Sequence, residues 1–90
     1  MPATYEVRIN NSRKEVVTAE DDPTVTAGDL LSLFGYHEFS QVLFADSFGP
    51  FEDGPAEFAK RRGTRYAHDD VVDLSQTRHF VTALRRTLEN

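Results

Sequence analysis

Hydrophobic and polar side chains alternate along residues 4–10, where Tyr5, Val7 and Ile9 point to one side of an extended chain. This two-residue period predicts a strand with one buried face. Residues 10–12 (Asn-Asn-Ser) predict a tight turn, since asparagine tolerates the left-handed backbone conformation that such turns require. Residues 13–19 then form a returning strand, so a β-hairpin is expected.

A short helix is predicted over residues 26–35, after the charged loop of residues 20–23. Thr26 suits the N-cap position, because its hydroxyl can accept a hydrogen bond from a free backbone N–H. Gly35 suits the end, because glycine enters the left-handed conformation without a steric penalty. A helix of about two turns is too short to be stable alone, so it must pack on a sheet. Its apolar face consists of Ala27, Leu30, Leu31 and Phe34.

The second half of the chain predicts further extended segments. Residues 41–45 include β-branched and aromatic side chains, which favour a strand. Residues 69–74 predict a short strand or a 3₁₀ turn. Residues 78–86 predict the last strand, with Phe80, Thr82 and Leu84 on one face. Its other face is also apolar, which favours a central position in the sheet. The connector of residues 36–40 carries two aromatic side chains that are expected to pack beneath the helix.

Residues 47–66 are the least regular part of the sequence and are interpreted as an insertion. Residues 47–55 contain several helix and strand breakers and predict a loop. Residues 55–63 are compatible with a two-turn helix, since proline suits a first turn and basic residues suit a last one. Residues 64–66 are compatible with a short strand.

The order of these elements predicts an α+β fold with a mixed sheet of four or five strands and one main helix. The last strand needs a buried place, and the natural one is beside the first strand and parallel to it. We expect one domain over residues 1–86, followed by a flexible tail over residues 87–90.

Charge and composition narrow the function classes. Formal charge is −5 over 90 residues, with −8 on residues 1–57 and +3 on residues 58–90. An acidic domain argues against general nucleic-acid binding, although the basic residues at 60–65 leave a local basic surface or a solvated face open. No apolar run reaches the roughly 20 residues of a membrane span, and no signal peptide is recognisable. The chain has no cysteine. We expect a cytoplasmic protein that binds neither membrane nor nucleic acid.

Catalytic constellations are not evident in the sequence, so an enzyme is not expected and no cofactor is predicted. The three histidines are His37, His68 and His79. His68 precedes two aspartates, but neighbouring side chains of a strand point to opposite faces, which disfavours a metal site. The acids at positions 46, 52 and 53 do not have the spacing of a calcium loop.

The helix start at residues 26–31 (Thr-Ala-Gly-Asp-Leu-Leu) and the last strand and basic end at residues 77–86 resemble ubiquitin. Residues 25–35, 69–74 and 78–82 more narrowly resemble the bacterial multiubiquitin family. The resemblance implies a β-grasp fold and a protein modifier whose C-terminus is activated and transferred by ubiquitin-activating-like and ubiquitin-conjugating-like enzymes. A deconjugating or processing protease is a further implied partner. Where ubiquitin ends in Gly-Gly, this chain has Arg86 and Thr87. Three alternatives follow: the enzymes accept another terminus, the protein is not conjugated, or the natural protein continues beyond Asn90.

Two surfaces are candidate sites. The first is a partner-binding patch on the sheet face opposite the helix, formed by His79, Val81 and Ala83 with Leu43, and the resemblance places His79 and Val81 at ubiquitin patch positions. The alternative is that Val81 and Ala83 are core residues covered by residues 47–66. The second site is the tail, for which the alternative is an ordinary frayed terminus. The conjugation residues implied by the resemblance are Arg85, Arg86, Thr87, Leu88, Glu89 and Asn90.

A non-covalent ubiquitin-like interaction module that binds through its sheet face is the alternative function. A sulfur carrier of the same fold is less favoured, because it also requires the terminal Gly-Gly.

Overall fold

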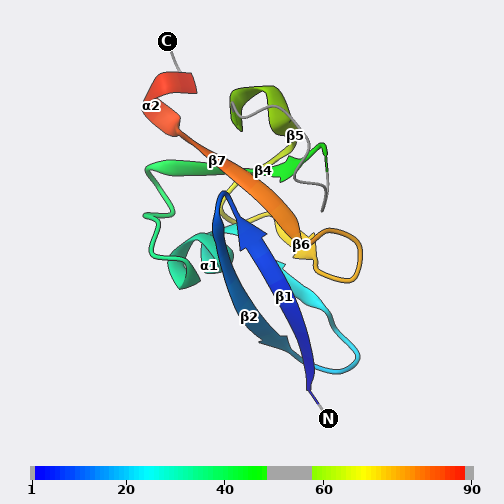
Figure 1. Ribbon diagram of the computed structural model, residues 1–90. Coiled ribbons are helices and arrows are strands. Elements are labelled where there is room, and N and C mark those ends of the chain that lie inside the picture. The colour runs from blue at the N-terminus through cyan, green and yellow to red at the C-terminus, as the bar shows by residue number, and fades with distance from the viewer. Residues whose placement is uncertain (1, 49–57, 89–90) are drawn as a thin grey trace.

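The computed structural model describes residues 2–48 and 58–88 and contains the expected hairpin (Figure 1). Strand β1 (Ala3–Ile9) pairs antiparallel with β2 (Ser12–Thr18), from Ala3 opposite Thr18 to Ile9 opposite Ser12. Asn10 has a φ of 55°, which is the left-handed conformation expected of the turn. The hairpin prediction is confirmed.

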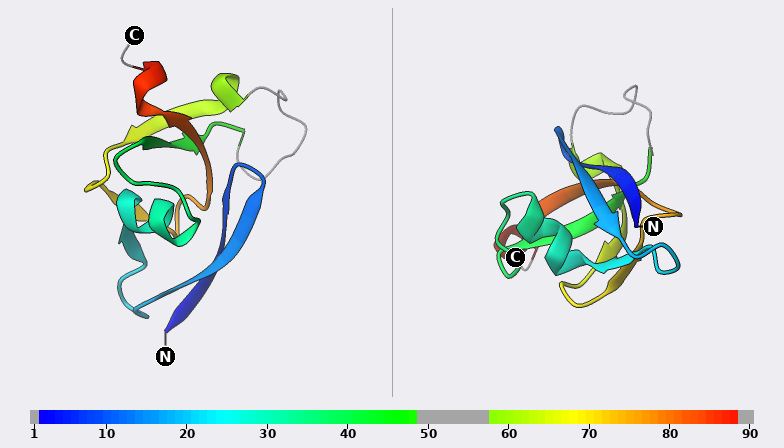
Figure 2. Two further views of the ribbon diagram at one scale, coloured as in Figure 1. Left: turned by 90° about the vertical axis from the view of Figure 1, so that its left-hand side faces the viewer. Right: turned by 90° about the horizontal axis from the view of Figure 1, so that it is seen from below.

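The main sheet has five strands in the order β2-β1-β7-β4-β5. Strand β7 (His79–Leu84) runs parallel to β1 and antiparallel to β4 (Gln41–Asp46), which in turn pairs with β5 (Arg62–Tyr66). The last strand therefore lies in the middle of a mixed sheet beside the first, as its two apolar faces predicted. Figure 2 shows the same arrangement from two further sides.

Helix α1 (Ala27–Leu33) has the predicted ends. The Thr26 hydroxyl accepts a hydrogen bond from the Asp29 N–H at 3.2 Å, and Gly35 has a φ of +83°. A two-stranded sheet, not fully anticipated, leads into the helix: β3 (Thr24–Thr26) pairs antiparallel with β6 (Val71–Asp73). Residues 69–74 thus contain a strand rather than a 3₁₀ turn.

The hydrophobic core lies between α1 and one face of the main sheet. Leu30 and Leu31 of the helix are buried against Ile9, Leu43 and Phe80 of the strands. Complete burial of one such side chain stabilises the fold by about 1.5–3 kcal/mol. Of the two connector aromatics, Tyr36 packs against this core, whereas Phe39 is exposed. The prediction for the connector is therefore right for Tyr36 and wrong for Phe39.

Residues 58–66, the part of the insertion after its undescribed segment, are more regular than predicted. A 3₁₀ turn, η1 (Phe58–Arg61), is followed at once by β5, so the strand begins four residues after Phe58 and includes Gly63. The predicted helix over residues 55–63 is wrong from Arg62 onward, and residues 55–57 lie outside the described residues. Strand pairing with β4 accounts for this difference, because it is a non-local interaction.

The end of the chain also differs from the prediction. Strand β7 ends at Leu84, two residues before the predicted boundary, and a single helical turn, α2 (Arg85–Leu88), follows. Thr87 and Leu88 therefore belong to this turn rather than to a freely extended tail. Glu89 and Asn90 lie outside the described residues. In Figure 1, α2 and η1 lie at the opposite end of the molecule from the N-terminus.

Within residues 2–48 and 58–88, no helix combines the length and the apolar character that crossing a bilayer would require.

Candidate functional site

The sheet face opposite α1 carries a second hydrophobic cluster, made of Val42, Phe44, Val81 and Ala83. The predicted facing of Val81 and Ala83 is correct, because both lie away from the helix. The expectation that they form an exposed patch is wrong: Val81 has 0% and Ala83 7% of its surface exposed. Both are core residues, as the alternative interpretation expected.

Leu43 cannot belong to that patch. It is completely buried in the main core beneath α1, because it alternates with Val42 and Phe44 along β4.

Arg62 and η1 form part of the cover over the second hydrophobic cluster. The Arg62 guanidinium lies 5.4 Å from the centre of the Phe44 ring, and η1 contacts β7. An arginine over an aromatic face is a favourable cation–π contact.

His79 is half-buried at the start of β7. Burial lowers its pKa, and the positive charges of Arg8, Arg78 and Arg13 lower it further, while Asp46 acts in the opposite direction. Its Nδ1 atom is buried and has no hydrogen-bond partner within the part of the chain that the structure describes. His79 therefore sits in a positively charged environment rather than on an apolar surface.

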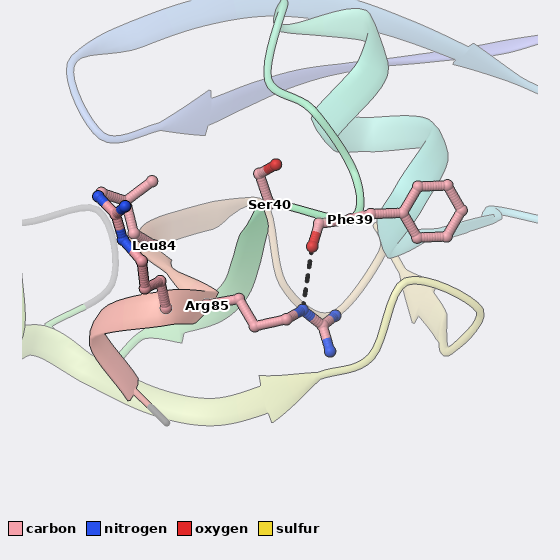
Figure 3. Close-up of a pocket in the computed structure, with 5 residues that line it drawn as sticks. Phe39, Ser40, Leu84 and Arg85 are labelled. Carbon is pink, nitrogen blue, oxygen red and sulfur yellow. Dashed lines mark hydrogen bonds between the residues drawn. The ribbon is translucent and has the colours of Figure 1, made fainter. Parts of the chain in front are cut away.

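The base of the tail forms an open pocket of about 430 Å³, lined by Phe39, Ser40, Leu84, Arg85 and Arg86 (Figure 3). The Arg85 backbone N–H donates to the Ser40 carbonyl at 2.9 Å, and its Nε donates to the Phe39 carbonyl at 3.1 Å. These two bonds fix the first residue of α2 against the connector after α1. Arg85 and Arg86 are thus the two predicted tail residues that the structure places at a pocket.

Two exposed apolar side chains flank this pocket. Phe39 is 56% and Leu84 46% exposed, and Figure 3 shows the Phe39 ring and the Leu84 side chain pointing to opposite sides of Arg85. The Phe39 ring contacts His68 edge-on, with ring centres 5.0 Å apart. Sequence reasoning assigned both residues to the interior. A phenylalanine between His37 and Ser40, outside any periodic pattern, was the available signal.

The structure also reveals a buried ionic cluster that the sequence did not predict. Asp46 accepts hydrogen bonds from Arg61 Nη2 at 2.7 Å and Nε at 3.1 Å, from the Phe48 N–H at 2.9 Å, and from Arg8 Nη2. The side chain of Asp46 is completely buried, and those of Arg8 and Arg61 nearly so. A buried carboxylate requires such partners, because desolvation of an isolated charge is very costly.

Among the described residues, no group of three or more histidine, aspartate or glutamate side chains is arranged to hold a metal ion. Comparisons with protein-family models, with curated proteins and with solved structures gave no match.

Proposed function

We propose that the chain is a β-grasp, ubiquitin-like domain. Three features support this assignment: the opening hairpin, the single main helix packed on one face of the sheet, and the last strand placed parallel to the first at the centre. Together with the resemblance in residues 25–35 and 77–86, this arrangement favours a ubiquitin-like protein over other small α+β proteins. Fold alone does not determine function, so the function must be argued from a site.

The proposed function is that of a bacterial ubiquitin-like modifier, activated at its C-terminal carboxylate and transferred by activating and conjugating enzymes in the cytoplasm. The observation that carries this proposal is the pocket at the base of the tail. There, two exposed apolar side chains and Arg85 and Arg86 lie where the chain leaves its rigid central strand. Exposed apolar groups beside a charged segment are typical of a docking surface. The protein would supply the carboxylate, whereas ATP and the catalytic residues would belong to the enzymes.

Helix α2 would have to unwind before the C-terminal segment could enter the channel of an activating enzyme. A helical turn of four residues has little stability of its own, because nucleation fixes several dihedral angles for few hydrogen bonds. An enzyme channel could therefore unwind it at low cost. The resemblance puts Arg86 and Thr87 at the positions of the ubiquitin glycines, so the channel of a cognate enzyme would have to be wide enough for two side chains.

The direct test is the intact mass of the protein after incubation with ATP, magnesium and a bacterial ubiquitin-activating-like enzyme. We expect a mass gain equal to one adenylate, or a covalent adduct with the enzyme. Both should disappear when Leu88, Glu89 and Asn90 are deleted. An unchanged mass, with an enzyme that is active on another substrate, would contradict the proposal.

Single substitutions test the docking surface. Phe39→Ala and Leu84→Asp should each lower kcat/KM for activation by roughly 30-fold, the effect of losing a binding hot spot of about 2 kcal/mol. Val71→Asp is the matched control, because Val71 is at least as exposed but does not line the pocket. Equal losses in all three variants would indicate a general effect of charge or folding rather than docking.

A non-covalent interaction module is the second candidate, and the ordering of α2 favours it. Arg85 makes two hydrogen bonds to the connector, which holds the start of the tail against the domain instead of presenting it to an enzyme. Because Val81 and Ala83 are buried, such a module would bind through Phe39 and Leu84 rather than through the predicted sheet face. It should keep its partner when residues 88–90 are deleted, whereas a modifier should lose its reaction.

A further inference from the structure

The sheet face opposite α1 carries a row of basic side chains that crosses three strands. Arg13 on β2 lies directly opposite Arg8 on β1, and Arg8 in turn lies beside His79 on β7. Like charges directly opposite one another on neighbouring strands destabilise a sheet. Positive charges therefore gather at this end of the face, while Glu6 and Glu15 oppose each other two positions further along the same two strands.

Asp46 and Glu6 offset part of this positive charge. Asp46 is bound by both Arg8 and Arg61, while Glu6 lies 3.7 Å from Arg13 in a pair whose side chains are both more than half exposed. Water screens an exposed pair strongly, so Glu6 contributes little. The three arginines each make further interactions as well. The distinguishing feature of this site is that several guanidinium groups lie close to one buried carboxylate, that of Asp46.

These arginines line a pocket of about 250 Å³ at the tip of the hairpin, together with Asn10 and Asn11. Every lining residue is polar. Arg8 and Arg61 are more than nine-tenths buried and are held in place by Asp46. Asn10 is fixed by hydrogen bonds from its amide group to Tyr36 and Thr82. The part of the wall formed by Arg8, Arg61 and Asn10 is thus ordered before any ligand arrives, which reduces the entropy lost on binding, whereas Arg13 and Asn11 are exposed.

We propose that this basic pocket, lined by Arg8, Arg13 and Arg61, binds a tetrahedral oxyanion of the phosphate class. Guanidinium groups present planar pairs of N–H donors that match the oxygen atoms of a phosphoryl group. A doubly charged anion would also offset the arginines that face one another across β1 and β2. This site lies on a different surface from the tail pocket and does not depend on the function proposed for the C-terminus.

His79 provides an internal reporter for the site. Its pKa is lowered by burial and by the charges of Arg8, Arg78 and Arg13, against the opposing charge of Asp46. An anion bound among Arg8, Arg13 and Arg61 adds negative charge close to the imidazole. The bound anion should therefore raise the pKa of His79.

The test is an NMR titration of the ¹⁵N-labelled protein with sodium phosphate, with sodium chloride added to keep ionic strength constant. We expect saturable shifts of the backbone amides of Asn10, Asn11 and Arg61. A second titration over pH, with and without sodium sulfate, should show a higher pKa of His79 when sulfate is present. Shifts that never saturate, or an unchanged pKa of His79, would overturn the proposal.

Two charge-matched variants make the test specific. Arg13→Gln should weaken phosphate binding by about 10-fold, since one charge-assisted contact contributes on the order of one tenfold step in affinity. Lys14→Gln removes the same charge from the neighbouring exposed position on the other face of β2 and should leave the affinity within about 2-fold. Equal weakening in both variants would mean general screening and would refute a defined site.

Comparison of ligands identifies the anion. Sodium acetate should bind at least about 10-fold more weakly than phosphate, because a single carboxylate has less charge and fewer oxygens to engage the three arginines. Acetate binding as tight as phosphate would overturn the assignment to the phosphate class. O-phosphoserine that binds more tightly than inorganic phosphate would identify a phosphoryl group on a larger molecule as the ligand. Weaker binding would identify the free anion.

Discussion

Replacement of Asp46 by asparagine should remove a large part of the stability of this domain. Each carboxylate oxygen accepts two hydrogen bonds: Oδ1 from the Phe48 N–H and Arg61 Nε, and Oδ2 from Nη2 atoms of Arg8 and Arg61. An amide has one acceptor oxygen, so two of the four bonds are lost, and the amide N–H₂ group faces cationic donors in either orientation. Hydrogen bonds to charged groups contribute about 1.5–3 kcal/mol each, which gives a loss of about 3–6 kcal/mol.

A second line of reasoning reaches a similar value. Asp46→Asn leaves Arg8 and Arg61 buried without the carboxylate that binds them both, and breaking a buried pair in this way typically costs about 3–5 kcal/mol. The total stability of a domain this size is roughly 5–13 kcal/mol. In a domain of 60–100 residues, each kcal/mol lowers Tm by roughly 4–8 °C, so a fall of at least about 12 °C is expected.

The measurement is urea unfolding followed by far-UV circular dichroism, because urea leaves ionic strength unchanged whereas guanidinium chloride does not. Asp21→Asn is the control, since it removes the same charge from an exposed loop and should change stability by less than about 0.5 kcal/mol. A loss below about 1 kcal/mol for D46N, with a native spectrum and an unchanged m-value, would refute this account of the cluster.

If D46N does not fold, the Arg61→Met variant keeps the reasoning testable. Arg61→Met leaves Asp46 bound by Arg8, so a smaller loss is expected. Where D46N does fold, the double variant D46N/R61M lacks one of the two buried cations that lose their shared carboxylate in D46N. Its loss should therefore be at least about 1 kcal/mol smaller than the sum of the two single losses. Additive losses would show that Asp46 and Arg61 are not energetically coupled.

Three further predictions concern single residues, each measured by urea unfolding. Gly28→Ala, which would stabilise an ordinary helix, should destabilise this one by about 1–3 kcal/mol, because a Cβ would lie 2.8 Å from the His68 carbonyl oxygen; a gain in stability would contradict that contact. Stability should decrease as pH falls from about 6.5 toward the lowered pKa of His79, because the unfolded chain then binds the proton more readily, and His79→Gln should reduce this pH dependence; an unaltered slope would locate the effect elsewhere. Thr26→Ala removes the N-cap hydrogen bond and should cost about 0.5–2 kcal/mol, whereas the exposed Thr64→Ala should have little effect; equal losses would argue against capping.

Local signals in the sequence predicted the hairpin and α1, because turn and capping preferences act over a few residues. The positive φ of Asn10, the cap at Thr26 and the helix end at Gly35 are all of this kind. The central position of β7 was also accessible, since an apolar pattern on both faces requires cover on both sides.

The features that could not be predicted from the sequence depend on pairing between residues that are far apart in the chain. Strand β3 is three residues long and forms only against β6, which lies more than forty residues later. The burial of Val81 was not predictable because an apolar strand face looks the same whether another segment covers it or a partner does. Arg8 gave one signal that could have been used. It alternates with apolar residues on the strand beside β7, and β7 is apolar on both faces. A basic side chain buried at such a position needs a buried anion as its partner.

The parallel pairing of the first and last strands has a consequence for synthesis on the ribosome. Strand β1 reaches its central partner only after β7 has been made, so the sheet cannot close until nearly the whole described chain has emerged. Until then, the edge of β1 that will pair with β7 is available to other chains. Folding dominated by such long-range contacts is slow compared with that of helical bundles. The nascent chain is therefore expected to fold late and as one unit, and a chain stalled before residue 79 should be a target for chaperones.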